Sequence, residues 1–522
     1  MAESSSRSSS ESSPNARMLG GVAAAAVSLG VAALVAIPFP PHADPRGAIG
    51  SAIVDLTPGP VKEFVIQALG GLDKLFLAVV VLVVIAAVAA LAASYETRRR
   101  PVGSAIFVAA GLLGCAAVLS RPGATLPDVV PTVVGTAAGV AALRLLALRL
   151  WPAPDHPDES DDGDDVDVTR RMWLTTGGLL GFGVASGLLG LVIDRLASSV
   201  AAERETLAIP RPRIPAPPIP TGVQPKDVAL PSFLTDAADF YRVDIALSVP
   251  QLSRDEWRLR IHGMVDHEIT YSFADLDRFE VIEKAVTLTC VSNPVGGEYI
   301  STGMWTGYRL ADLLAAAGVS PDADMLLSKS VDGFTVGTPV EAIADGRDAM
   351  LAIGLNGQPL PVAHGYPARL VVAGLYGYVS ATKWVTDLEL TRFDRALAYW
   401  TRQGWAPRGP IKTESRIDVP KRGQQVRVGP TTFGGIAWAQ NRGVRAVEVR
   451  IDDGPWQPAQ LGDAYSDETW RLWSFGWQAD APGEHTITVR ATDNTGTVQT
   501  SDQASTVPDG ATGWHSVNFT VA

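Results

Sequence analysis

Long runs of apolar residues dominate the first two hundred positions of the chain. The five runs are residues 18–41, 75–95, 102–120, 129–148 and 172–193, and only the fourth contains a charge, Arg144. Each is close to the ~20 residues with which an α-helix crosses a bilayer. A buried helical bundle in a soluble domain is the alternative, but five such runs in one third of the chain favour membrane helices. The pattern predicts an all-α transmembrane anchor of five spans at residues 18–195.

Basic residues between the runs predict their orientation, because cytoplasmic loops are enriched in Lys and Arg. One side of the membrane receives Arg7, Arg17, Arg98, Arg99, Arg100, Arg144, Arg149, Arg170 and Arg171, and the other only Arg46, Lys62, Lys74, Arg121 and Arg195. We therefore expect a cytoplasmic tail at residues 1–17 and an extracytoplasmic location, outside the cell membrane, for everything after the fifth span. No histidine lies in a run, which argues against membrane haem, whereas binding of a quinone or a partner subunit stays open.

The segment before the fifth run carries two signals. Residues 152–171 are rich in Asp and Glu without EF-hand spacing, which favours a solvated loop over a calcium site. The loop ends in Thr169-Arg170-Arg171-Met172-Trp173-Leu174, which resembles a twin-arginine export signal. An ordinary positive-inside anchor is the alternative. Twin-arginine export would point to an outer domain that folds, with its cofactor, before it crosses the membrane.

The pattern changes after residue 195. Prolines crowd between residues 210 and 220, and residues 196–230 are predicted to be a stiff, proline-rich linker. Strand and helix signals then alternate. They predict strands at 257–261, 368–372 and 383–390, a short helix at 273–279 with Ser272 as its N-cap, a helix at 309–317 ended by Gly318, and partly helical structure at 341–353.

From about residue 411 the pattern is all-β. Val447, Val449 and Ile451 alternate with polar residues, as do residues 487–491, and each run ends in a turn rich in Asp and Gly. Short strands with this spacing predict an immunoglobulin-like sandwich. The tryptophans of this region are Trp438, Trp456, Trp470, Trp473, Trp477 and Trp514. We interpret them as core or dimer-interface residues, with a binding face as the alternative.

Composition sharpens this division. The chain of 522 residues is 47% hydrophobic and only 19% charged, which averages a membrane anchor with an ordinary outer region. The net charge of −12 argues against nucleic acid as a partner. The two cysteines, Cys115 and Cys290, are too few for a disulfide scaffold, a structural zinc site or an iron–sulfur cluster, and no Cys-x-x-Cys-His haem motif is present.

Cys290 is the cysteine of the outer region. It follows the apolar strand 285–289 and precedes a turn at 291–297 that contains two glycines. Three interpretations are consistent with this position. Cys290 is a buried apolar residue, the nucleophile of a hydrolase that uses His364 as its base, or a metal ligand.

Residues 231–522 resemble the sulfite oxidase family of molybdopterin oxidoreductases. The matching segments, in family order, are Phe240-Tyr241-Arg242, 257–265, Thr289-Cys290 with Asn293, Trp305-Thr306-Gly307, 310–314, 356–361, 364–370 and Lys383-Trp384. The all-β tail resembles the dimerisation domain of the family at 470–473, 490–493 and Gly513-Trp514-His515. The resemblance implies an α+β molybdopterin-binding catalytic domain at 231–400, a dimerisation domain at 401–522 and a possible homodimer.

The resemblance also implies roles for residues. Cys290 would be the one protein ligand to molybdenum, with two further sulfurs from the pterin dithiolene; a soft thiolate suits this metal. The other matching positions are Arg369 and Lys383 with the backbone of Ala381 and Thr382 for the pterin and its phosphate, Tyr241 and Arg242 in an early cofactor-binding segment, and Ser330 and His364 as further pterin contacts. Surface charge is the alternative for Arg369 and Lys383, and a plain strand residue for Ser330.

Some positions depart from the family pattern. The sulfite oxidases carry substrate-binding arginines where this chain has Pro294 and Val295, and a catalytic tyrosine where it has Ile353. Arg242 remains as a catalytic-site residue for an anion. The resemblance implies a molybdenum cofactor, oxygen-atom transfer to or from a small oxo substrate, and electron exchange with a separate carrier. Sulfite oxidation and reduction of an S- or N-oxide both stay open, and so does an exported scaffold that has lost catalysis.

Overall fold

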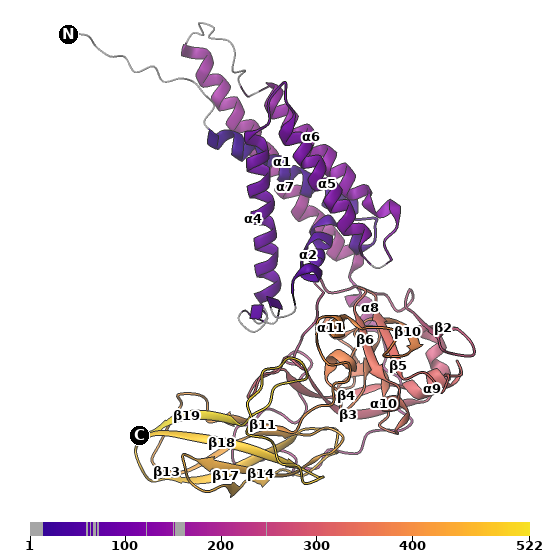
Figure 1. The fold of residues 1–522 in the computed structure, drawn as a ribbon, viewed down its shortest axis with the longest axis vertical. Coiled ribbons are helices and arrows are strands. Elements are labelled where there is room, and N and C mark those ends of the chain that lie inside the picture. The colour runs from indigo at the N-terminus through magenta and orange to yellow at the C-terminus, as the bar shows by residue number, and fades with distance from the viewer. Residues whose placement is uncertain are drawn as a thin grey trace, which may run out of the picture. The chain divides into compact units, whose positions relative to one another are not determined.

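The computed structural model describes residues 14–58, 61–62, 64–65, 69, 72–121, 123–149, 151, 162–246 and 248–522. The chain divides into two compact units, Met1–Ser199 and Val200–Ala522 (Figure 1). The first unit is helical, and the second is rich in β-strands. The division follows the change of pattern that the sequence shows near residue 195.

The helices of the first unit confirm the five predicted apolar segments as candidate membrane spans. The helices are α1 (Pro14–Ala36), α2 (Pro45–Leu56), α4 (Asp73–Ser94), α5 (Val102–Leu119), α6 (Val130–Arg149) and α7 (Asp162–Ser198). Five segments are long and apolar enough to cross a bilayer, namely Asn15–Ala36, Lys74–Ser94, Val102–Leu119, Leu126–Arg149 and Arg170–Ile193. The sequence analysis missed α2, which starts at Pro45 behind the N-cap Asp44, whose side chain accepts a hydrogen bond from the backbone N–H of Arg46.

Small residues allow α1 to pack closely against α4 and α7. A Cβ atom on Gly21 would lie 2.1 Å from the carbonyl oxygen of Ala89, and one on Gly183 would lie 2.3 Å from the carbonyl carbon of Ala26. Close backbone approach of this kind is how apolar helices associate without a hydrophobic driving force. Arg144, the charge inside the fourth run, donates to Glu96 Oε1 at 2.8 Å, so its cation is paired.

The acidic segment before the fifth span differs from the expected loop. Residues 152–161 lie outside the described residues, but from Asp162 onward the chain is already part of α7.

The first part of the second unit contains two sheets. One has the strand order β2-β1-β10-β5-β6 and the other β3-β4-β7-β8, with β9 paired to β7. The strands are β1 (Arg258–Gly263), β2 (Ile269–Ser272), β3 (Val281–Thr289), β4 (Ile300–Arg309), β5 (Met325–Ser330), β6 (Thr335–Pro339), β7 (Met350–Leu355), β8 (Gln358–Pro359), β9 (Arg369–Val371) and β10 (Val385–Thr391). The short helices are α8 (Ala201–Thr206), α9 (Leu310–Ala315), α10 (Glu341–Ala344) and α11 (Tyr399–Arg402).

The local predictions in this region are largely confirmed. Leu259 and Ile261 of β1 are buried, whereas Arg258 and Arg260 are exposed. Ser272 and Asp275 form a capping box at the start of a 3₁₀ helix, Phe273–Arg278. The segment predicted as partly helical divides instead into the single turn of α10 and the fully buried strand β7, because a continuous apolar run does not distinguish helix from strand.

The C-terminal part consists of two sheets that share one core. Their strand orders are β11-β13-β17-β16 and β12-β19-β18-β14-β15. The strands are β11 (Glu414–Val419), β12 (Gln425–Val426), β13 (Gly429–Trp438), β14 (Val444–Ile451), β15 (Gln457–Pro458), β16 (Gln460–Leu461), β17 (Arg471–Ala479), β18 (Gly483–Asp493) and β19 (His515–Val521). Phe433, Val449 and Phe519 lie in the core between the sheets. Trp438 and Trp470 belong to the core of the preceding part, so the two parts pack on each other.

The proline-rich segment contacts the second unit directly. Ile214 pairs with Ile282 of β3 in parallel, and the backbone N–H of Arg213 donates to Val281 O at 2.9 Å. Val223 is buried in the core. We expected a stiff spacer here, and the segment instead lies along a strand, a position that tolerates prolines at a sheet edge.

A buried carboxyl group at the start of β11 makes stability depend on pH. Glu414 is buried, and burial raises its pKa to about 8. The folded state therefore keeps a proton that the unfolded state has released above about pH 4.3, so the free energy of unfolding falls as the pH rises from about 4.3 to about 8, by at most about 5 kcal/mol. Glu414→Gln, which does not titrate, should lose much less stability between pH 5 and pH 8, as measured by thermal unfolding. Equal losses in the variant and the parent would contradict this; Glu205→Gln, at an exposed position, is the control.

Candidate active site

Cys290 lies directly after β3, where the chain leaves the sheet. Its backbone N–H donates to Tyr299 O at 2.9 Å, and its carbonyl accepts from the N–H of Asn293 at 3.1 Å. The side-chain oxygen of Asn293 accepts from the N–H of Tyr299 at 2.8 Å. These bonds close the turn that the sequence predicts and fix the backbone that carries the thiol.

Residues of the C-terminal sandwich donate hydrogen bonds to the end of β3 and to the turn after Cys290. Gln440 Nε2 donates to Thr289 Oγ1 at 3.1 Å and to Thr287 O at 3.3 Å. Arg416 Nη1 donates to Gly297 O at 2.8 Å. A Cβ atom on Gly296 would lie 2.3 Å from the ring of His515, so only glycine fits between the turn and that ring. The sequence analysis did not assign a role to Gln440, Arg416 or His515 in this site.

Tyr241 lies close to both Cys290 and Arg369. Burial and the neighbouring Cys290 raise the pKa of Tyr241 above its ordinary value. The guanidinium of Arg369 is buried, with Cζ 5.1 Å from the centroid of the Trp305 ring. Its Nη1 donates to His364 O at 3.1 Å and its Nη2 to Ala381 O at 3.2 Å. Arg369 thereby connects the two loops that carry the predicted cofactor contacts.

A second group of charges adjoins this one. Lys383 Nζ lies 2.6 Å from Asp244 Oδ2, and Arg242 Nε lies 2.8 Å from the same oxygen. Burial lowers the pKa of Lys383 to about 8, against the opposing effect of Asp244. Burial and the cations Arg369, Lys383 and Arg242 lower the pKa of His364 to about 3, so His364 is neutral at physiological pH. Three cations, Arg242, Arg369 and Lys383, face two nearby carboxylates, Asp244 and Asp332, an excess that favours an anion.

Ser330 and Thr382 lie at the edge of these charges. Ser330 ends β5 and is buried, with its hydroxyl close enough to Asp332 to lower the pKa of that carboxyl group, although burial raises the pKa overall. Thr382 Oγ1 lies 2.7 Å from Ser328 Oγ, and Thr382 O accepts from the N–H of Leu370. The side chain of Thr382 therefore points into the fold, away from a ligand. All nine predicted site residues thus belong to connected segments around Cys290.

Protein side chains alone do not provide a metal centre here. Within the described part of the chain, no group of three or more His, Cys, Asp or Glu side chains is arranged to hold a metal ion. A metal at Cys290 would need most of its ligands from another molecule.

Comparison with known proteins agrees with this geometry. Residues 246–400 match the family described as oxidoreductase molybdopterin binding domain. The uncharacterized oxidoreductase YuiH of Bacillus subtilis is 31% identical over 154 residues, which cover 30% of this chain and 74% of that protein. The chain belongs to the sulfite oxidase family of molybdopterin oxidoreductases.

Other members of this family match a longer part of the chain. Mitochondrial sulfite oxidase of Homo sapiens is 30% identical over 280 residues, which cover 45% of this chain and 51% of that protein. The chain therefore spans about half the length of the curated sulfite oxidases that it matches. Among solved structures, the sulfane dehydrogenase SoxCD of Paracoccus pantotrophus is 27% identical, with a TM-score of 0.46, and the match covers 52% of this chain and 75% of that chain.

The residues of the site fit the molybdenum cofactor of this family. A thiolate is a suitable donor for a soft metal, and Cys290 is placed at the end of a strand beside Tyr241, which in turn adjoins the buried cation Arg369. The phosphate of a pterin needs charged donors of this kind. The side-chain amide nitrogen of Asn293 and the hydroxyl of Ser330 are buried without a hydrogen bond of normal geometry to the described residues, so both retain capacity for a ligand.

The three residues that depart from the sulfite oxidase pattern lie in different places in the structure. Pro294 is exposed and Val295 is partly exposed in the turn after Cys290. Because both side chains are uncharged, neither can pair with an anionic substrate. Ile353 is fully buried in the interior of β7. Arg242, which was predicted to hold an anion, directs its Nε and Nη2 atoms toward Asp244, and its side chain remains more than one third exposed.

Proposed function

We propose that the chain is a membrane-anchored, exported oxidoreductase in which Cys290 ligates molybdenum and the surrounding cations hold the pterin. The observation that supports this most directly is that Tyr241 adjoins both Cys290 and Arg369, and so connects the thiol to the group formed by Arg369, Lys383, Arg242 and neutral His364. When bound, the cofactor supplies two-electron redox chemistry and oxygen-atom transfer.

The chain's own residues have distinct tasks in this proposal. Arg369 remains cationic, since burial lowers its pKa only to about 10, and it is placed to bind the phosphate or the pterin. Lys383 serves the same anion, with Asp244 keeping its ammonium oriented. His364 is neutral, so it offers a hydrogen bond without adding charge. Gln440 and Arg416 hold the backbone on either side of Cys290 in place.

The substrate proposed is a small oxo compound. Because Pro294 and Val295 provide no cation, we favour a weakly charged S- or N-oxide over sulfite as the better substrate, with sulfite oxidation as the competing activity. Electrons would pass to or from a separate carrier. The two-sheet C-terminal part is proposed to be an immunoglobulin-like sandwich that supports a homodimer.

The test uses the full chain purified in detergent. We expect about one molybdenum and one pterin per chain, from metal analysis and from the fluorescence of the released, oxidised pterin. The protein is then supplied with sulfite and an artificial electron acceptor, or with sulfoxides and a reduced dye. A folded chain without molybdenum or pterin would refute the proposal, and faster turnover of sulfite than of any sulfoxide would refute the substrate preference.

Export by the twin-arginine route is tested with charge-preserving substitutions. Arg170 and Arg171 are exposed near the start of the fifth candidate span. Replacing both by lysine keeps the positive charge that sets membrane orientation but removes the arginine pair. We expect the second unit to stay on the cytoplasmic face, as shown by protease resistance of a C-terminal tag in intact spheroplasts. The matched control replaces Arg98 and Arg99 by lysine, and equal protease sensitivity in both variants would show an ordinary positive-inside anchor.

A further inference from the structure

Helix α8 is hydrogen-bonded to a loop that carries one of the predicted cofactor contacts. This loop, residues 359–366, includes His364 and is named the His364 loop. Arg204 of α8 donates through Nε to Leu360 O and through Nη2 to Pro359 O, both at 2.8 Å. The planar guanidinium thus binds two neighbouring carbonyl groups at once and fixes the start of the loop.

Glu203 fixes the end of the same loop. The side chain of Tyr366 is fully buried, and its hydroxyl donates to Glu203 Oε1 at 2.6 Å. The carboxylate also accepts from Ser253 Oγ at 2.6 Å and from the backbone N–H of Arg254 at 2.8 Å. Partial burial by itself would raise the pKa of Glu203, but these hydrogen bonds outweigh it and lower the pKa below its ordinary value. Glu203 is therefore ionised at neutral pH, and an ionised acceptor makes the stronger hydrogen bonds.

The loop between these two attachments contacts two cations of the cofactor site. His364 O accepts a hydrogen bond from Arg369 Nη1 at 3.1 Å, and Lys383 Nζ lies 3.5 Å from Ala363 O. Gly365 has a φ of 111°, and a Cβ atom there would lie 3.0 Å from Cβ of Arg369 and 3.2 Å from Cα of Lys383. A shift of the loop would therefore displace groups that contact both cations.

Helix α8 follows the helical first unit almost directly along the chain. Helix α7 ends at Ser198 and α8 starts at Ala201. Val200, between them, is buried in a core cluster that also contains Tyr366. The stiff linker that the sequence predicts here therefore does not set α8 apart from the second unit. The bonds to the His364 loop instead begin a few residues after the last candidate span.

We propose that α8 is a positioning element of the cofactor site, in which Glu203 and Arg204 hold the His364 loop so that Arg369 and Lys383 retain the pterin. Neither side chain of α8 touches the pterin in this proposal, because both act through the loop. The inference rests on the proposed function, since it concerns retention of the same cofactor. Removing the bonds between α8 and the loop is expected to speed the release of pterin.

The rate of pterin release from the full chain in detergent tests the proposal. Pterin that stays bound is measured by gel filtration at successive times, followed by oxidation and fluorescence. Arg204→Gln and Glu203→Gln should each release pterin at least about tenfold faster than the parent, because each removes a charged partner of the loop. Combining Glu203→Gln with Tyr366→Phe should accelerate release by less than the product of the two single effects, since both substitutions remove the same hydrogen bond.

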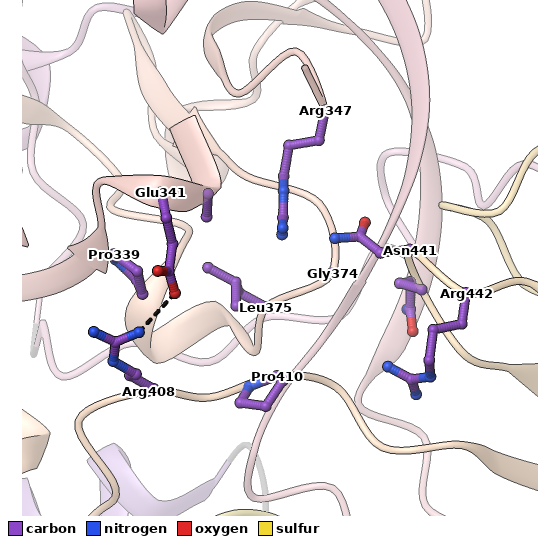
Figure 2. Close-up of a pocket in the computed structure, with 11 residues that line it drawn as sticks. Pro339, Glu341, Arg347, Gly374, Leu375, Arg408, Pro410, Asn441 and Arg442 are labelled. Atoms are coloured by element: carbon purple, nitrogen blue, oxygen red, sulfur yellow. Dashed lines mark hydrogen bonds and ion pairs between the residues drawn. The ribbon is translucent and has the colours of Figure 1, made fainter. Parts of the chain in front are cut away.

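Two controls remove similar interactions elsewhere in the second unit. Arg471 donates to Gly462 O at 2.9 Å and to Val444 O at 2.8 Å, so Arg471→Gln also removes an arginine that binds two carbonyl groups. Figure 2 shows the ion pair of Glu341 with Arg408 beside a cavity of about 220 Å³, which none of the nine predicted site residues lines. Glu341→Gln removes this carboxylate. Both controls should release pterin at the rate of the parent.

A second measurement does not need the cofactor. Amide hydrogen exchange is measured on chains produced in cells that cannot make the pterin. The amides of His364 and Gly365 both donate hydrogen bonds within the loop. Peptides that contain them should exchange at least about fivefold faster in Glu203→Gln and Arg204→Gln than in the parent, and at the parental rate in both controls, because the loosening is local.

The outcomes separate this inference from the proposed function. A parent chain without pterin would refute both together. With pterin in the parent, release at the parental rate from Glu203→Gln and Arg204→Gln would overturn this inference alone, and so would equal acceleration in Arg471→Gln. If either α8 variant fails to fold, Tyr366→Phe decides, because it removes one hydroxyl and keeps the ring; it should release pterin about threefold faster, and an unchanged rate would overturn the inference.

Discussion

Cys290→Ser is expected to abolish turnover while the pterin stays bound. A hydroxyl is a harder donor than a thiol and stays protonated at neutral pH, so it does not replace a soft thiolate. Substitution of a residue that hydrogen-bonds to a metal ligand typically lowers metal affinity or activity 10–100-fold. Loss of the direct ligand should therefore lower turnover by at least ~10³-fold. Arg369 and Lys383 do not depend on the thiol for their positions, because they are held by His364 O, Ala381 O and Asp244. Pterin content should therefore remain near one per chain.

The matched control for this experiment is the second cysteine. Cys115 lies in α5, within the third candidate span and far along the chain from the cofactor residues, so Cys115→Ser should keep both pterin and turnover. Turnover is measured with the substrate that the screen identifies. Visible absorption provides a second readout, because a thiolate bound to a metal contributes absorption that a serine hydroxyl does not. Full activity in Cys290→Ser would refute the ligand assignment, and loss of turnover in both serine variants would point to a general effect on the fold.

The candidate membrane spans of the first unit were predictable because their signal is local. Each span is a continuous apolar run, and a helix satisfies its own backbone within such a run. The same reasoning explains the two departures in this part. The helix α2 is short and carries charges, so no long apolar run reveals it, and the acidic residues from Asp162 onward were compatible with a loop as well as with the first turns of α7.

Some residues of the site could be predicted from local sequence, and others could not because they reach the site through long-range contacts. Cys290, Arg369 and Lys383 lie in short segments whose local sequence resembles the family, and the structure gathers them around one place. Asp244, which orients Lys383, is 139 positions away from it, and Gln440 is 151 positions from Thr289. Contacts of this kind are set by the packing of the sandwich on the sheets, and a single sequence carries no local pattern for them.

Arg242 illustrates the limit of assigning a role from type and position alone. The sequence offers it as the cation for an anionic substrate. In the structure its guanidinium is committed to Asp244, the carboxylate that also contacts Lys383. Asp244 is thus shared between two cations and links the segment of Arg242 to Lys383. Arg242 also contributes to the positive charge that lowers the pKa of His364.

Arg369→Gln is expected to produce the opposite result to the cysteine substitution, namely loss of the pterin itself. Arg369 is the buried cation of the group, and hydrogen bonds to a charged partner contribute about 1.5–3 kcal/mol each. Removing two such bonds to an anionic pterin should weaken binding by at least ~10²-fold, and pterin content after gel filtration should fall to about a tenth of that in the parent or less.

The interpretation of that loss depends on showing that the fold persists, since Arg369 also bonds His364 O and Ala381 O. Arg369→Lys keeps the charge but not the two-armed geometry, so it should retain more pterin than Arg369→Gln at a similar melting temperature. Arg395→Gln, an exposed arginine of the same unit, should retain all of it. If Arg369→Gln folds and keeps a full complement of pterin, the anion is held elsewhere; if pterin is lost from Arg369→Gln but not from Cys290→Ser, the arginine holds the cofactor and the cysteine serves its metal.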